Sequence, residues 1–156
     1  LSALQGMALP GDKPVYGVAS TAALSVGQAE GLEGEGVTVV GDARRNRLWS
    51  VTYRVDPATQ RVRLFDGRRP THSAEDFMLT PSDELAAAVP AGTRIVTSDW
   101  DRVSGVLKGA FSAERLVARA VFPKAADVGR LALSEPEACV FEPLPVYLHP
   151  AVAAKA

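Results

Sequence analysis

The stretch VVGDARRNRLWSVTYRV, residues 39–55, decides the fold. A short apolar run stops at Asp42, a polar ARRN segment follows, and apolar and polar residues then alternate. The alternation predicts a strand over 47–55 with four large side chains on one side: Trp49, Val51, Tyr53 and Val55. Two strands joined by a short turn-rich segment predict an antiparallel hairpin. The hairpin leaves one question, which is whether Asp42 is a catalytic carboxylate at a strand end or the first residue of the turn.

The composition is that of one globular domain. The chain has 156 residues, of which 47% are hydrophobic and 22% charged, and its formal net charge is -1. A charge so close to zero does not indicate a polyanionic partner for the molecule as a whole. Cys139 is the single cysteine, which excludes an intramolecular disulfide and a cysteine-pair zinc site and fits a reducing cytoplasm. No apolar run approaches the ~18 residues of a membrane span, and the first residues lack the basic region of a signal peptide.

The remaining pattern predicts a mixed α/β chain. Before the hairpin we expect a helix with Leu4, Met7 and Ala8 on one face, a strand over 13–20, and a helix over 21–29 capped by Ser20. The apolar VTVVG run, residues 37–41, predicts a central strand, and a third strand over 60–65, with Val62 and Leu64 inward, completes an antiparallel meander. The second half predicts a short helix from Ser82, then a strand over 94–99 and a helix containing Val103, Val106, Leu107 and Ala110. A strand over 115–122, a helix over 124–133 and an extended tail follow. Three antiparallel strands followed by strand–helix–strand–helix are the ribonuclease-H-like order.

That order raises the hypothesis of a metal-dependent nuclease. Nucleases of this fold hold two metal ions with carboxylates at the ends of the first and fourth strands. Asp42 and Asp99, with Asp101 close by, follow those strands, and Asp127 or Glu114 could supply a third ligand. The opposing interpretation is structural, because aspartate is common at turns and helix caps and Asp42 lies just past its strand.

Other catalytic chemistry has little support. The two histidines, His72 and His149, lie in loop-like or proline-flanked sequence, which favours exposed polar residues over general bases. Cys139 stands in apolar company, which favours a small buried side chain over a nucleophile. The sequence contains no phosphate-binding loop and no paired histidines at metal-ligand spacing.

Arginine is concentrated in the middle of the chain. Eight arginines fall between residues 44 and 69: Arg44, Arg45, Arg47, Arg54, Arg61, Arg63, Arg68 and Arg69. On paired hairpins they predict one basic edge that could dock RNA or an acidic protein surface, and the competing interpretation is a solvated face. Trp49 and Tyr53 could stack on bases, but their alternation with Val51 and Val55 favours core packing.

Four segments together resemble a known family. They are ALQGMAL with PVYGVAST and AAL in residues 3–24, VVGDARRNRLWSVTY in 39–53, the segment around AADVGRLAL in 123–133, and EPLPVYLHP in 142–150. In this order they resemble the bacterial TsaB (YeaZ) proteins, glycoprotease-like members of the actin and sugar-kinase superfamily. The resemblance implies a C-terminal lobe over 36–134, preceded by a linking helix and strand over 1–30 from an upstream lobe and followed by a tail over 135–156.

The chain also departs from the family pattern. The upstream lobe, with its DTS strand and GPGSFTGLR segment, is missing. Arg47 stands where many members carry an acidic residue, Trp49 where they carry tyrosine, and His149 where arginine is common. The segment TSDW replaces a strand end that usually contains glycine.

The resemblance implies a function without catalysis by this chain. TsaB proteins are partners of the catalytic subunit TsaD and, with the ATPase TsaE, serve the transfer of threonylcarbamoyl to N6 of the adenosine beside the tRNA anticodon. The implied chain is cytoplasmic, holds no cofactor or metal, meets tRNA through the complex and could form a homodimer. Asp42 then begins the hairpin turn, and the candidate contacts to partner or RNA are Asp42, Arg44, Arg45, Arg61 and Arg63.

Overall fold

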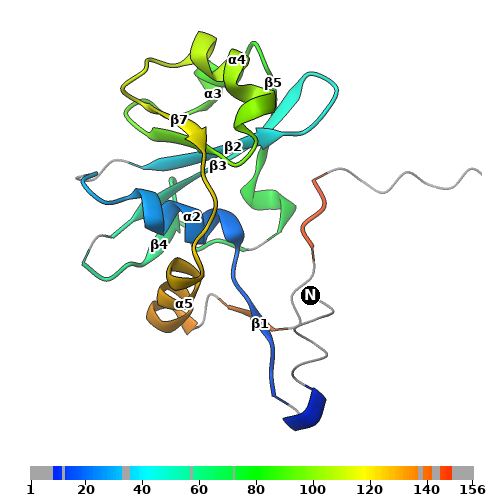
Figure 1. The fold of residues 1–156 in the computed structure, drawn as a ribbon, viewed down its shortest axis with the longest axis vertical. Helices are drawn as coiled ribbons and strands as arrows, with labels where there is room; N and C mark the ends of the chain where they lie inside the picture. The colour runs from blue at the N-terminus through cyan, green and yellow to red at the C-terminus, as the bar shows by residue number, and fades with distance from the viewer. Residues whose placement is uncertain are drawn as a thin grey trace, which may run out of the picture.

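The computed structural model describes residues 9–11, 13–32, 36–56, 58–71, 73–136, 139–141 and 145–148. The expected helix around Leu4 and Met7 lies outside these ranges, as do His72 and His149. The described chain opens with a 3-10 turn, η1 (Leu9–Gly11). Figure 1 shows a central sheet with helices on both of its faces.

The main sheet has the predicted order. Its path is β4-β3-β2-β6-β7, formed by β4 (Val62–Leu64), β3 (Arg47–Val55), β2 (Val37–Asp42), β6 (Arg94–Thr97) and β7 (Leu116–Ala120). The β2–β3 and β3–β4 pairs are antiparallel, while β2–β6 and β6–β7 are parallel. This confirms the antiparallel meander and the mixed α/β, ribonuclease-H-like architecture. A sixth strand that the sequence did not predict, β5 (Met78–Pro81), pairs with the first half of β3.

The helices confirm the predicted order and correct two predicted caps. They are α2 (Ser20–Gln28), α3 (Leu85–Ala88), α4 (Trp100–Ala110) and α5 (Ala125–Ser134), with a 3-10 turn, η2 (Ala74–Asp76), before β5. Ser20 is the first residue of α2 and not its cap, and Ala19 at the cap position makes no side-chain cap bond. Helix α3 begins three residues after Ser82, whose hydroxyl donates to Oδ1 of Asn46 at 2.8 Å.

Each face of the sheet carries its own hydrophobic cluster. On one face, Val51 and Tyr53 are buried with residues of α2 and α5, and Trp49 and Val55 pack against them, which confirms the predicted inward side of β3. On the other face, Leu48 packs with residues of α3 and α4. In Figure 1, α3 and α4 lie above the sheet and α2 and α5 lie below it.

A separate two-stranded sheet pairs a segment near the start of the described chain with a segment near its end. The strand expected over 13–20 is shorter than predicted, because β1 contains only Tyr16–Gly17. It pairs antiparallel with β8 (Val140–Phe141), so residues just before α2 lie beside residues after α5. The division into segments 1–30, 36–134 and 135–156 stays a prediction. Within the described ranges, none of the helices combines the length and the apolar character needed to cross a bilayer.

Candidate interaction sites

The parallel pairing of β2 with β6 brings Asp42 and Asp99 together, as the sequence predicted. Asp42 is the last residue of β2, paired with Leu48, so it belongs to the strand and does not lie past its end. Asp99 stands at the cap position of α4, yet its carboxylate makes no bond to that helix. Instead its Oδ2 accepts the backbone N–H of Asp42 at 3.1 Å. The carboxylate of Asp99 therefore ties the end of β6 to the end of β2.

The Asp42 side chain is already engaged by donors. Its Oδ1 accepts the backbone N–H of Arg44 at 2.7 Å, which confirms that Asp42 stabilises the turn. Its Oδ2 lies 3.5 Å from the Arg44 guanidinium and 3.8 Å from that of Arg102 on α4. Arg102 was not among the predicted contacts. The Asp42 carboxylate therefore stabilises the structure, because a backbone amide and two arginines already occupy its oxygens.

The predicted third metal ligands lie elsewhere. Asp127 is buried on α5 and its Oδ1 accepts from Arg130 at 3.0 Å, while Asp101 and Glu114 are exposed. In the described part of the chain, no three acidic, histidine or cysteine side chains are grouped so that they could hold a metal ion. The expectation that Asp127 or Glu114 completes a site with Asp42 and Asp99 was therefore wrong.

The tip of the β2–β3 hairpin has an unusual backbone. Arg44, Arg45 and Asn46 all have positive φ, at 67°, 52° and 59°. This region disfavours side chains other than glycine and costs on the order of 1 kcal/mol per residue. Three hydrogen bonds hold the tip. The Arg44 N–H donates to the Asp42 carboxylate, and the Arg47 N–H donates to the Arg44 carbonyl at 3.1 Å. The Ser82 hydroxyl donates to the side-chain oxygen of Asn46. The tip presents Arg44 and Arg45 to solvent in a fixed position.

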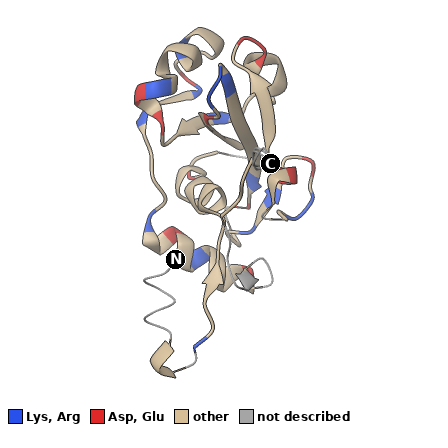
Figure 2. Ribbon diagram, turned by 90° about the vertical axis from the view of Figure 1, so that its right-hand side faces the viewer, with Lys and Arg blue, Asp and Glu red and all other residues tan. Residues whose placement is uncertain are grey.

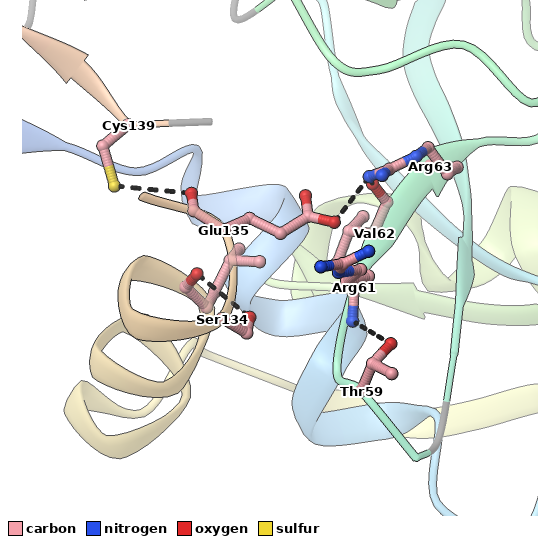
Figure 3. A network of polar contacts seen from close by, with 8 residues as sticks. Thr59, Arg61, Val62, Arg63, Ser134, Glu135 and Cys139 are labelled. Atoms are coloured by element: carbon pink, nitrogen blue, oxygen red, sulfur yellow. Dashed lines mark hydrogen bonds and ion pairs between the residues drawn. The ribbon is translucent and has the colours of Figure 1, made fainter. Parts of the chain in front are cut away.

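The two other predicted contacts lie near the opposite end of β3. Arg61 is exposed just before β4. Arg63 on β4 forms an ion pair with Glu135, 2.6 Å from Nη1 to Oε1, and the Glu135 side chain is 2% exposed (Figure 3). The predicted single basic edge is thus divided between the two ends of the nine-residue β3. Figure 2 shows basic and acidic segments intermixed over the ribbon.

A cavity of about 600 Å³ lies on the α2 face of the sheet. Its walls come from distant segments, which include the start of α2, strands β2 and β3, Asp76, Phe77, Phe122, Pro145, Val146 and Leu148. The Tyr53 hydroxyl at this cavity is hydrogen bonded to Oγ1 of Thr21 at 2.8 Å, and burial raises its pKa well above the ordinary range of tyrosine. Trp49 and Phe77 meet edge to face, with ring centroids 5.7 Å apart. A mostly apolar hollow with a few hydroxyl groups and the Asp76 carboxylate, which is bonded to Thr71, suits a largely apolar ligand or side chain.

Sequence reasoning missed this cavity, since no motif joins its walls. The sequence did predict part of its lining, because Trp49 and Tyr53 were expected on the inward side of the strand that became β3. Cys139 is half-buried, with Sγ 4.0 Å from the Glu135 carbonyl, and is therefore less buried than expected.

The comparisons with known proteins agree with this geometry. No protein-family model and no curated protein matches the sequence. A solved structure of YeaZ from Pseudomonas aeruginosa superposes with a TM-score of 0.61 at 20% identity, over 89% of this chain and 60% of that one. A second P. aeruginosa structure, described as similar to the peptidase YeaZ, gives a TM-score of 0.59 at 23% identity over 95% of this chain and 65% of that one. The chain thus has the fold of these proteins and spans less than two thirds of their length.

Proposed function

We propose that this chain is the C-terminal lobe of a TsaB-like, non-catalytic subunit of the machinery that places threonylcarbamoyladenosine in tRNA. The observation that carries the proposal is the fold, because the YeaZ and YeaZ-like structures superpose on 89% and 95% of this chain. Fold alone does not fix function, and the family resemblance of the four sequence segments supplies the rest of the argument.

The environment of the carboxylates supports a non-catalytic role. Asp42 and Asp99 lie together, as a nuclease would require, but their oxygens bond backbone amides and arginines. Each bond secures a strand end or a turn, which is what a scaffold needs from these residues. In the proposed complex, a TsaD-like subunit provides the chemistry, a TsaE-like ATPase joins it, and tRNA is met in the cytoplasm through the assembly.

The decisive experiment measures the modified nucleoside. We expect threonylcarbamoyladenosine in total tRNA, measured by mass spectrometry, to fall when the intact gene is depleted and to recover when it is restored. A gene carrying Asp99→Asn should restore the modification at least in part, because the residue acts on structure and not on chemistry. An unchanged modification level under verified depletion would contradict the proposal.

A matched assay tests the nuclease alternative. Purified protein with Mg²⁺ is incubated with structured RNA, beside the Asp42→Asn and Asp99→Asn variants and with circular dichroism to verify folding. We expect no cleavage that depends on these two residues. Magnesium-dependent cleavage that both variants abolish would assign the carboxylate pair to catalysis.

A further inference from the structure

The β3–β4 hairpin brings arginines together across its strands. Arg54 on β3 pairs directly with Arg63 on β4. Like charges in directly opposed positions of a sheet destabilise it. Arg61 precedes Arg63 by two residues, and strand alternation directs both to the same side of the hairpin. Three guanidinium groups therefore emerge from one short region.

Among these three arginines, Arg63 is the one that forms an ion pair within 4 Å in the described part of the chain. Its ion pair with Glu135, and a second bond to the Val62 carbonyl at 2.7 Å, fix its side chain at the outer edge of the sheet (Figure 3). Arg54 and Arg61 are both exposed. Neither has a carboxylate within 4 Å among the residues that the structure describes.

The neighbours of Arg54 and Arg61, which are Phe65 and Asp56, make contacts that stabilise the hairpin. The Arg54 guanidinium lies over the Phe65 ring, 4.4 Å from its centroid, which fixes the guanidinium plane and leaves its edges for hydrogen bonds. Asp56 is the acidic residue across the turn from Arg61. Its Oδ1 accepts the N–H groups of Ala58 and Thr59. A hydrogen bond from the Thr59 side chain, these two N–H groups and, to a smaller extent, the charge of Arg61 hold the pKa of Asp56 below its usual range. Asp56 thus acts on Arg61 only through a weak long-range attraction, and the exposed Arg61 guanidinium can still bind an external anion.

The surface around these arginines is polar. Large exposed apolar side chains occur elsewhere in the described chain: Leu9, Tyr16, Met78, Phe122, Leu133, Val146 and Tyr147. None of them lies on the C-terminal half of β3 or on β4, and the one near in sequence to a partner of these arginines is Leu133 on α5, two residues before Glu135. Protein interfaces have an apolar, aromatic-rich centre, whereas nucleic-acid interfaces are more polar and positively charged. The contrast favours phosphates over the carboxylates of a partner protein.

We propose that Arg54 and Arg61 bind phosphates of an RNA backbone, with Arg63 and Glu135 as positioning residues that hold the edge strand in place. We name Arg54 and Arg61 the phosphate pair. Guanidinium groups suit this task because they donate paired hydrogen bonds in a fixed plane. The choice of tRNA as the RNA rests on the proposed function, while the binding of phosphates stands on the hairpin itself.

The test is the salt dependence of tRNA affinity. Unmodified tRNA transcript is titrated with the full-length protein, alone and in its complex with TsaD and TsaE, at several salt concentrations. Each phosphate contact contributes about 0.7–0.9 to the slope of log affinity against log salt. We expect Arg54→Ala combined with Arg61→Ala to reduce the steepness by about 1.4–1.8, while the corresponding lysine variants keep most of it.

The control removes equal charge from another region. Arg119 on β7 and Lys108 on α4 are both exposed, and their joint replacement by alanine should leave the slope nearly unchanged. An equal decrease in this control would show a general charge effect and overturn the proposal. So would an unchanged slope in the phosphate-pair variant, or an absence of tRNA binding by both the protein and the complex at low salt.

Two further results separate the possible causes of failure. If the phosphate-pair variant keeps its tRNA affinity but loses affinity for polyglutamate, the surface binds a protein carboxylate and the proposal is wrong. If depletion of the gene leaves threonylcarbamoyladenosine unchanged while the salt slope responds as expected, the proposed pathway fails and the phosphate site stands.

Discussion

The two faces of the sheet are built differently. On the α4 face, aliphatic and aromatic side chains from α3, α4, β2, β3 and β6 form a buried cluster. On the α2 face, a comparable cluster borders the cavity of about 600 Å³. The α4 face therefore serves mainly for stability. The α2 face combines stability with space that a ligand or another segment could fill.

Two glycines on the α2 face have side chains close to them, whereas the two glycines of α4 do not. Gly41 on β2 pairs with Trp49, whose indole occupies the position that a Cβ would take. Gly27 on α2 lies against the Asp127 carboxylate of α5 in the same way. On the other side, Gly105 and Gly109 of α4 have open space around them. Substitutions can therefore test whether the two faces differ in tolerance.

The largest effect is expected from Leu107→Ala, on the closed face. Leu107 is 0% exposed, and its truncation should lower the free energy of unfolding by about 3–5 kcal/mol through lost burial and a new void. Leu24→Ala is the matched variant beside the cavity, where neighbours are already absent on one side. We expect it to cost about 2 kcal/mol, measured by urea unfolding. Equal losses for the two variants would contradict the difference between the faces.

Gly41→Ala should cost about 1–3 kcal/mol, because the added methyl group overlaps the indole of Trp49. The displaced ring should also change tryptophan fluorescence. Gly105→Ala is the control, since it adds a methyl group to an exposed helix with open space around it. That change should stabilise the protein by about 0.5–1 kcal/mol. A neutral Gly41→Ala variant would show that Trp49 has room to move.

Gly27→Ala should separate α2 from α5 and cost about 1–2 kcal/mol, despite the better helix propensity of alanine. The opposing group is the Asp127 carboxylate, so Asp127→Ala should relieve the overlap. We expect the double variant to be more stable than the sum of the single effects predicts. Strict additivity in chemical unfolding would mean that the two residues do not oppose each other in solution.

Among the destabilising variants, Tyr53→Phe should have the smallest effect, about 1 kcal/mol, because it removes one hydrogen bond to Thr21 and preserves the ring. Its pH dependence carries more information. Burial raises the pKa of Tyr53, so the folded state retains the proton and stability should fall as the pH rises above about 10, where the unfolded tyrosine ionises. The phenylalanine variant should show less of this fall. An identical decline in both proteins would assign it to other groups.

The sequence predicted the elements whose pattern is strong and local. The alternation in residues 47–55 predicted β3 to the residue, and the apolar run before Asp42 predicted β2. Strand β5 was missed because it is short, lacks clear alternation and ends at Pro81. Asp42 and Asp99 were correctly predicted to lie side by side, since they stand at or just after the carboxyl ends of parallel neighbours, although β6 ends at Thr97 and not at Asp99.

What the sequence could not predict depends on distant partners. The local sequence around Ser82 is typical of a helix cap, but its hydroxyl donates a hydrogen bond to Asn46 at the hairpin tip instead. Arg63 and Glu135 are separated by 72 residues, and no periodic pattern relates them. The cavity likewise arises where segments from both halves of the chain meet. The resemblance to a family indicated the fold but could not show which arginines are already paired.

The two short strands beside β3 have a consequence for self-assembly. β5 pairs with Arg47–Ser50 and β4 pairs with Tyr53–Val55, so this side of the sheet is divided between two separate pieces. A long, flat outer strand would be a template for pairing with another chain, and short, charged or proline-terminated edges prevent this. Here one piece ends at Pro81 and the other has three residues with Arg63 in the middle. The division of the outer strand thus protects this edge of the sheet from pairing with the sheet of another molecule.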